Sequence, residues 1–138
     1  MIRVLLVEDN VADVELVREA LSCCDLQHEM EVASDFEEAR QFIEQIGVSE
    51  TRPDVVLMDL NLPKGSGLDL LRMLRAKPGG HNVPVVVVSS SNAPSDRARA
   101  AEYNVKDYFR KPADIDEFMK LGPMVRSIVG KDGRHGSI

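Results

Sequence analysis

The apolar residues of this chain follow two alternating patterns. Short runs rich in valine, isoleucine and leucine are typical of strands, whereas apolar residues that recur every three or four positions are typical of amphipathic helices. The short runs predict strands at residues 3–7, 28–33, 55–58, 85–88 and 105–110, and the spaced repeats predict helices at residues 11–24, 36–46, 67–77, 94–103 and 114–129. Strand followed by helix, five times over, predicts an α/β fold with one doubly wound, five-stranded parallel sheet and right-handed crossovers.

Two of the predicted helices have unusual features. The fourth has only Ala98 and Ala101 on its predicted inward face, and alanine buries little area at about 25 cal/mol per Å². We therefore expect this helix to be the least firmly packed. The fifth contains Pro123 within its apolar pattern. Because proline has no backbone N–H, we expect a kink near residues 119–122.

Length and charge narrow the range of functions. The 138 residues fit one domain; we assign residues 1–130 to it and expect the polar, glycine-rich residues 131–138 to form a flexible tail. The formal net charge is −6, so the overall field repels phosphates and we expect no nucleic-acid partner. No apolar run is long enough for a secretory signal or a membrane span, which predicts a cytoplasmic protein with no membrane partner.

Reactive side chains follow four of the five predicted strands. In a parallel sheet the carboxyl ends of the strands share one edge, and ligands bind in the crevice beyond it. Glu8 and Asp9 follow the first strand, Asp59 follows the third, Ser89 and Ser90 follow the fourth, and Lys111 follows the fifth. The sequence therefore brings three carboxylates, two hydroxyls and one ammonium group to the same edge.

Three carboxylates so close together require a cation. Two of them at 4 Å repel each other by about 4 kcal/mol at an effective dielectric constant near 20. Lys111 alone does not neutralise Glu8, Asp9 and Asp59, whereas a divalent cation with oxygen ligands does, so we expect Mg²⁺ or Mn²⁺ here. A phosphoryl group can then approach Asp59, the candidate nucleophile, and Ser89 is placed to contact the phosphoryl oxygens.

Four motifs carry a resemblance to a known family. LLVEDN at the first strand, VVLMDLNLPKGSG at the third, VVVVSSS at the fourth and DYFRKP at the fifth are similar to the receiver domain of two-component response regulators. The likeness extends from residue 2 to about residue 129. It implies a flavodoxin-like sheet with strand order 2-1-3-4-5. It also implies a signalling protein that catalyses only its own phosphorylation and dephosphorylation and is otherwise no enzyme.

The resemblance assigns a role to each site residue. Asp59 matches the aspartate that accepts the phosphoryl group, Glu8 and Asp9 match the acidic magnesium pair, and the backbone carbonyl of Asn61 is expected to reach the metal. Ser89 matches the switch hydroxyl, Tyr108 the switch aromatic and Lys111 the family's lysine, whose bond to Pro112 is expected to be cis. Asn61, Ser90 and Ser91 fall at positions that tune how long the phosphoryl group lasts.

The resemblance also predicts partners. The phosphoryl donor is expected to be the phosphohistidine of a sensor histidine kinase. ADVELVREAL after the first strand and the PVVVVSSS strand are most similar to single-domain regulators that partner phytochrome-type or hybrid kinases. On phosphorylation Ser89 is expected to move inward and Tyr108 to fill the vacated space, which alters partner binding. A homodimer through the face formed by residues 94–103, 105–110 and 114–129 is left open.

Other functions remain as alternatives. Asp59-Leu60-Asn61 faintly resembles the nucleophile motif of phosphatases that form an aspartyl phosphate, but Asn61 stands where an acid is needed. A flavodoxin-like FMN protein needs a phosphate-binding loop after the first strand, and residues 8–13 are acidic here. Two further alternatives are an interaction module that is never phosphorylated and a receiver excised from a larger regulator.

Overall fold

The computed structural model describes residues 1–48, 52–91 and 93–130, so the predicted tail at 131–138 lies outside the described residues. A five-stranded parallel sheet forms the centre, with the order β2-β1-β3-β6-β7. Its strands are β1 (Ile2–Val7), β2 (His28–Ala33), β3 (Val55–Met58), β6 (Val85–Ser89) and β7 (Asp107–Arg110). This confirms the predicted α/β fold and the flavodoxin-like strand order.

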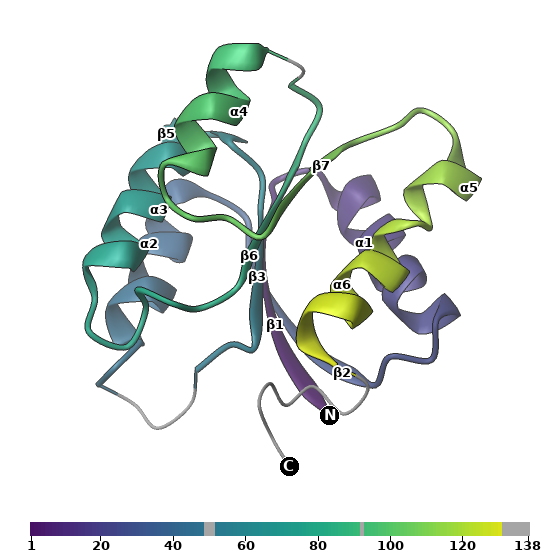
Figure 1. Ribbon diagram of the computed structural model, residues 1–138, viewed down its shortest axis with the longest axis horizontal. Helices are drawn as coiled ribbons and strands as arrows, with labels where there is room; N and C mark the ends of the chain where they lie inside the picture. The colour runs from purple at the N-terminus through teal and green to yellow at the C-terminus, as the bar shows by residue number, and fades with distance from the viewer. Residues whose placement is uncertain (49–51, 92, 131–138) are drawn as a thin grey trace.

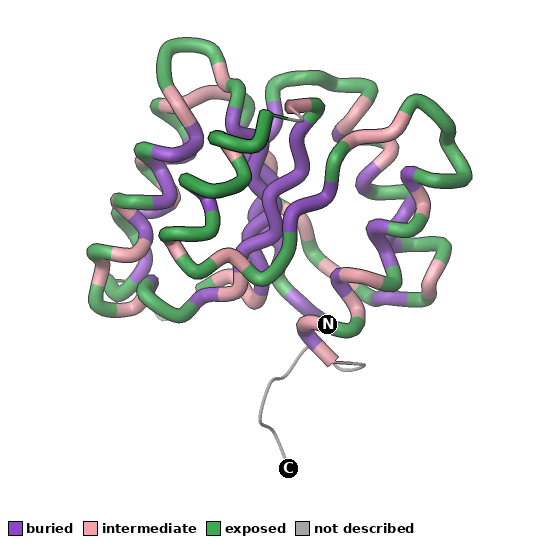
Figure 2. Tube along the Cα trace, turned by 45° about the horizontal axis from the view of Figure 1, so that its top comes forward, coloured by how far each residue is buried: buried purple, intermediate pink, exposed green. Residues whose placement is uncertain are grey.

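Helices cover both faces of the sheet and make three layers (Figure 1). One face carries α2 (Phe36–Gln45), α3 (Gly67–Ala76) and α4 (Pro94–Ala101), and the other carries α1 (Val11–Cys23), α5 (Ile115–Phe118) and α6 (Leu121–Val129). Successive residues of a strand point to opposite faces, so β1 contributes Leu5 to the first core and Leu6 to the second. The central strands are buried on both sides (Figure 2).

The predicted kink in the last helix is a complete break. Helix α5 ends at Phe118, Met119 and Lys120 form a turn, and α6 begins at Leu121. Pro123 therefore lies in the first turn of α6, where a backbone N–H has no partner within the helix and its loss costs nothing. A Cβ atom on the adjacent Gly122 would lie 2.1 Å from the carbonyl oxygen of Ala20, so glycine allows α6 to approach α1 closely.

Helix α4 packs through a different alanine from the ones predicted. Ala98 and Ala101 are both exposed, and Ala100 is the buried residue of this helix. The prediction of the inward face was wrong because three alanines spread around an eight-residue helix give no periodic signal. The expected light packing agrees with the structure, since α4 contributes one small side chain to the core.

The end of α3 is tied to its surroundings by Arg75. The guanidinium donates hydrogen bonds to four backbone carbonyl oxygens, those of Tyr103 (2.7 Å), Val83 (2.7 Å), Gly80 (3.0 Å) and Asn104 (3.2 Å). Two of these residues lie in the loop before β6, and two follow α4. Burial lowers the pKa of Arg75 from its usual value, and the four carbonyls replace water around the charge.

The segment between β3 and α3 contains a small hairpin that the sequence did not predict. Its strands are β4 (Asn61–Leu62) and β5 (Gly65–Ser66), joined by a turn in which Lys64 has a φ of 69°. A Cβ atom at Gly65 would lie 2.3 Å from the ring of Phe36, so the chain passes close to α2 there. Within the described part of the chain, no helix has the length and apolar character needed to span a membrane.

Candidate functional site

Asp59 lies at the carboxyl end of the central strand β3. Met58 pairs with Val7 of β1 and the backbone N–H of Asp59 donates to the carbonyl oxygen of Val7 (3.0 Å), which fixes the carboxylate beside the end of β1. Its Oδ1 atom accepts a hydrogen bond from the backbone N–H of Asn61 (3.0 Å). Asp59 is buried, and a Cβ atom on Gly67 would lie 2.6 Å from its carbonyl oxygen. The close approach of α3 therefore positions this residue.

Glu8 and Asp9 lie next to Asp59, as the strand order predicts. The backbone N–H of Glu8 donates to Ala33 of β2 (3.0 Å), and its Oε2 atom accepts from the N–H of Asn10 (3.1 Å). Glu8 is buried and Asp9 is exposed. One carboxylate oxygen from each of Glu8, Asp9 and Asp59 lies within 4.8 Å of the other two. Three hard oxygen donors so close together fit a divalent cation such as Mg²⁺ or Mn²⁺.

Lys111 joins the acidic residues from the end of β7. Its backbone N–H donates to the carbonyl oxygen of Ser89 (2.8 Å), which continues the pairing of β6 with β7. Its Nζ atom lies 2.7 Å from Glu8 Oε1 and 2.9 Å from Asp59 Oδ2. A third carboxylate, Asp13 Oδ2, lies 2.8 Å away. The sequence predicted the first two neighbours of Lys111 and missed the third.

Asp13 comes from the first turn of α1 rather than from a strand end. Asn10 is the N-cap of that helix, and its Oδ1 atom accepts a hydrogen bond from the backbone N–H of Asp13 (3.1 Å). An acidic residue in the first helical turn is common because it interacts favourably with the helix dipole. The sequence signal was therefore weak, and the pairing becomes apparent only once β7 and α1 are seen to lie together.

Burial and charge shift the pKa values of two of these groups. Burial raises the pKa of Glu8 to about 7, and repulsion from Asp59 adds to the rise, while the hydrogen bond and charge of Lys111 oppose it. For Lys111, burial lowers the pKa, but hydrogen bonds to Asp13, Glu8 and Asp59 outweigh it and raise the pKa above its usual value. The ammonium group therefore stays charged at neutral pH.

The predicted switch residues Ser89 and Tyr108 lie on β6 and β7, and the predicted lifetime residues Ser90 and Ser91 lie in the loop after β6. The third lifetime residue, Asn61, lies in β4 beside Asp59. Ser89 is buried, and its Oγ atom accepts a hydrogen bond from the backbone N–H of Ser91 (3.2 Å). Ser91 donates from its hydroxyl to Asp96 Oδ2 (2.5 Å), and Ser90 is exposed. The Tyr108 hydroxyl donates to the carbonyl oxygen of Ser91 (3.1 Å). These contacts connect the end of β6 to the start of α4 and to Tyr108.

Arg97 lies over the ring of Tyr108, an interaction that the sequence did not predict. Its guanidinium carbon is 4.5 Å from the ring centroid, within the range of a cation–π interaction. Tyr108 is thus held by Ser91 at its hydroxyl and by α4 at its ring.

The expectation of a cis peptide bond between Lys111 and Pro112 was wrong. No peptide bond is cis within the described residues, so this bond is trans in the structure. The physical reason is that an X–Pro bond favours trans by about 0.5–1 kcal/mol. With the trans bond, Lys111 Nζ still lies within 2.9 Å of Asp59 Oδ2.

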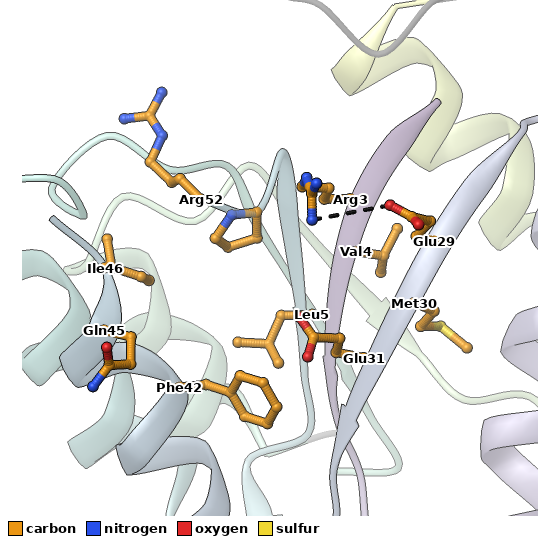
Figure 3. Close-up of a pocket in the computed structure, with 11 residues that line it drawn as sticks. Arg3, Val4, Leu5, Glu29, Met30, Glu31, Phe42, Gln45, Ile46 and Arg52 are labelled. Atoms are coloured by element: carbon orange, nitrogen blue, oxygen red, sulfur yellow. Dashed lines mark ion pairs between the residues drawn. The ribbon is translucent and has the colours of Figure 1, made fainter. Parts of the chain in front are cut away.

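A separate cavity of about 460 Å³ lies at the opposite end of the sheet, near the first residues of β1 and β2 (Figure 3). Arg3 and Glu29, which are opposite each other on the adjacent strands β1 and β2, form an ion pair at its edge with N and O atoms 3.9 Å apart (Figure 3). Phe42 and Leu5 contribute to its apolar wall. None of the predicted site residues lines this cavity, so the acidic cluster and the cavity are independent features.

Comparisons with known proteins agree with this geometry. The family model of the response regulator receiver domain matches residues 4–121. Response regulator Rcp1 of Synechocystis is 35% identical over 120 residues, which are 86% of this chain and 82% of Rcp1. Response regulator MprA of Mycolicibacterium vanbaalenii is 29% identical over 133 residues, 96% of this chain but 54% of MprA. The chain thus spans most of one relative and about half of the other.

Solved structures show the same likeness. The phosphorylated cyanobacterial phytochrome response regulator RcpA is 32% identical, with a TM-score of 0.82 and a coverage of 91% of both chains. The Mn²⁺-bound form of Rcp1 is 33% identical, with a TM-score of 0.81 and a coverage of 92% of this chain and 93% of Rcp1. The family model match and the identity to Rcp1 together show that this chain belongs to the response regulator receiver domain family of two-component systems.

Proposed function

We propose that this chain receives a phosphoryl group on Asp59 from the phosphohistidine of a sensor histidine kinase and changes its partner binding as a result. The observation that carries the proposal is the contact of Lys111 Nζ with both Asp59 Oδ2 (2.9 Å) and Glu8 Oε1 (2.7 Å). A lysine held against a buried carboxylate at the ligand-binding edge of a parallel sheet suits phosphoryl transfer, where positioning and charge neutralisation supply most of the catalysis.

Asp59 serves as the nucleophile in this proposal. One of its carboxylate oxygens forms a bond to phosphorus while the bond from phosphorus to the histidine nitrogen breaks. The electron pair of the broken bond stays on the imidazole, which takes up a proton. The Asn61 N–H, 3.0 Å from Asp59 Oδ1, orients the carboxylate for attack. Lys111 offsets negative charge on the phosphoryl oxygens.

Glu8, Asp9 and Asp59 would hold the divalent cation, together with the backbone carbonyl of Asn61. When bound, Mg²⁺ or Mn²⁺ supplies positive charge that lets an anionic phosphoryl group approach a carboxylate. The three carboxylate oxygens within 4.8 Å of one another support this assignment. The Mn²⁺-bound structure of Rcp1, at 33% identity, supports it further.

Ser89, Tyr108 and α4 form the proposed switch. Ser89 turns its hydroxyl from the Ser91 N–H toward the phosphoryl oxygens, and Tyr108 gives up its bond to Ser91 to fill the vacated space. Asn61, Ser90 and Ser91, at the rim of the site, tune the lifetime of the phosphoryl group. The shared contacts of Ser91 with Ser89, Tyr108 and Asp96 support this coupling.

The kinase partner is proposed to be of the phytochrome type or a hybrid kinase, because RcpA is described as a cyanobacterial phytochrome response regulator. Residues 1–130 form the receiver and residues 131–138 a tail in this proposal. The receiver acts in the cytoplasm through protein contacts, without binding nucleic acid or membrane, and a homodimer would use the face of α4, β7, α5 and α6.

Phosphorylation of the purified chain with acetyl phosphate and Mg²⁺ tests the proposal. The mass should increase by one phosphoryl group, and Asp59→Asn should abolish the increase because an amide is a poor nucleophile. Asp69→Asn is the matched control, since Asp69 is an exposed aspartate on α3 that pairs with Arg72. Persistent labelling of Asp59→Asn would place the phosphoryl group elsewhere, and an unlabelled wild-type chain would favour an interaction module that is never phosphorylated.

A further inference from the structure

The ammonium group of Lys111 is fully engaged by carboxylates. A lysine side chain has three N–H donors, and three carboxylate oxygens lie at hydrogen-bond distance, from Glu8 (2.7 Å), Asp13 (2.8 Å) and Asp59 (2.9 Å). A phosphoryl oxygen that needs a hydrogen bond from Lys111 must therefore displace one of these carboxylates.

Asp13 differs from the other two partners. Its side chain is 21% exposed, compared with 1% for Glu8 and 7% for Asp59. The group of carboxylates whose oxygens lie within 4.8 Å of one another contains Glu8, Asp9 and Asp59 but not Asp13. Asp13 therefore contacts the ammonium group without joining the candidate metal ligands, and of the three carboxylates bonded to Lys111 it is the one that water reaches most easily.

Asp13 also changes the charge of the site. The site holds four carboxylates and one ammonium group: Glu8, Asp13 and Asp59 contact Lys111, and Asp9 lies beside Glu8 and Asp59. Lys111 and a bound divalent cation together bring three positive charges. These balance the ionised carboxylates of Glu8, Asp9 and Asp59. The negative charge of Asp13 remains, and Asp13 is not one of the candidate metal ligands. An anionic phosphodonor is therefore repelled when it approaches Asp59.

We propose that Asp13 is a positioning residue that holds one N–H of Lys111 in the unphosphorylated protein and slows phosphorylation by anionic donors. This inference rests on the proposed function. When Asp59 is phosphorylated, Lys111 exchanges its hydrogen bond to Asp13 for a hydrogen bond to a phosphoryl oxygen. Asp13 is the partner released because it is the most exposed of the three, so water can replace its hydrogen bond at the least cost, whereas water does not reach the buried Glu8.

Two small phosphodonors of different charge separate this electrostatic role from a structural one. With acetyl phosphate, an Asp59 oxygen bonds to phosphorus as the bond to the acetate oxygen breaks, and acetate leaves with the electron pair. Acetyl phosphate is doubly charged at neutral pH, while phosphoramidate carries a lower net charge and releases ammonia after protonation of its nitrogen. A residue that acts through its negative charge therefore slows phosphorylation by acetyl phosphate more than phosphorylation by phosphoramidate.

The experiment compares phosphorylation rates of the wild type and Asp13→Asn at saturating Mg²⁺. The rate with acetyl phosphate should rise roughly three- to tenfold, equivalent to about 0.7–1.4 kcal/mol, and the rate with phosphoramidate should rise less. Asp13→Glu retains the charge and should lose most of this gain. Glu15→Gln is the matched control, because Glu15 is an exposed acid on the same helix that pairs with Arg18.

A second measurement tests whether Asp13→Asn changes the affinity for Mg²⁺. The Mg²⁺ concentration that gives half of the thermal stabilisation should change by less than about tenfold in Asp13→Asn. Loss of a group that hydrogen-bonds to a metal ligand typically lowers the metal affinity by about 10–100-fold. A larger change would assign Asp13 to the metal site and overturn the proposal. An unchanged or slower rate with acetyl phosphate, or an equal rise with both donors, would also overturn it.

The salt dependence of the rate supplies a further test. Added KCl screens the repulsion, so at saturating Mg²⁺ the rate with acetyl phosphate should increase with salt more steeply in the wild type than in Asp13→Asn, because the rest of the net charge of −6 is common to both. An equal salt dependence contradicts the proposal. Failure of the proposed function is distinguishable, because the wild type would then take no label on Asp59. If the wild type is labelled and Asp13→Asn is phosphorylated at the same rate, the proposed function stands and only the role of Asp13 is contradicted.

Discussion

Helices α3 and α4 lie side by side on the same face of the sheet (Figure 1), yet they are held there in different ways. Helix α3 buries five residues, among them Leu70, Leu71 and Leu74. Helix α4 buries only Ala100. Burial of a leucine side chain contributes about 1.5–3 kcal/mol, and a methyl group about 0.8 kcal/mol. The sheet therefore holds α3 several times more strongly than α4.

This difference matches the positions of the two helices relative to the site. The start of α3 packs against the backbone of Asp59, the proposed nucleophile. The start of α4 is connected to Ser89 and Tyr108 through Ser91, in the region proposed to move. Firm packing thus coincides with the proposed nucleophile and light packing with the proposed switch. Regions that move in signalling are commonly drawn from the least stable parts of a fold.

The largest expected effect is on α3. Leu71→Ala removes a fully buried side chain and should lower the free energy of unfolding by about 2–5 kcal/mol, because it leaves a cavity in the core. Urea denaturation measures the loss. Arg72→Ala, at the exposed neighbouring position, should stay within about 0.5 kcal/mol of the wild type. A loss below about 1 kcal/mol for Leu71→Ala would mean that α3 is not the firmly held helix.

A smaller effect is expected on α4. Ala100→Gly should lower the free energy of unfolding by about 1.5 kcal/mol, from the lost buried methyl group and the poorer helix propensity of glycine. Ala98→Gly, at an exposed position of the same helix, should show only the propensity loss of about 0.5–1 kcal/mol. Amide exchange in the wild type should show lower protection in α4 than in α3. Equal protection would remove the contrast between the helices.

The smallest expected effect is that of Arg97→Ala. A cation–π pair at an exposed site contributes about 0.5–1 kcal/mol, so the variant should remain nearly as stable as the wild type while the ring of Tyr108 becomes more accessible. The chain has no tryptophan and two tyrosines, so acrylamide quenching in a Tyr103→Phe background reports on Tyr108 alone. Quenching should increase in Arg97→Ala and not in Arg99→Ala, and identical quenching in both would mean that Arg97 does not cover the ring.

The sequence predicted those parts of the molecule that depend on local pattern. Buried strands such as residues 55–58 and 85–88 show as continuous apolar runs, and the residues after them meet because parallel strands share a carboxyl edge. For this reason the sequence alone predicts that Glu8, Asp59 and Lys111 lie together. Pro123 likewise predicted a kink near residues 119–122 from its chemistry, and the structure has a complete break between α5 and α6 at this place.

The missed features depend on distant parts of the chain. Lys111 and Asp13 are 98 residues apart, and their contact requires the relative placement of β7 and α1. The inward face of α4 could not be predicted because its alanines have no periodic contrast with each other. The trans bond before Pro112 reflects a preference of about 0.5–1 kcal/mol, too small for a motif to determine.

The four hydrogen bonds of Arg75 have a mechanical consequence for α4. Two of them anchor the backbone at Tyr103 and Asn104, just after the helix, to the end of α3. A lysine could not replace this residue, because the bonds require donors spread over a planar fork. The anchored end acts as a pivot, so a rotation of α4 displaces Pro94 the most and Tyr103 the least. The amplitude is therefore greatest at the end of the helix that lies beside Ser91.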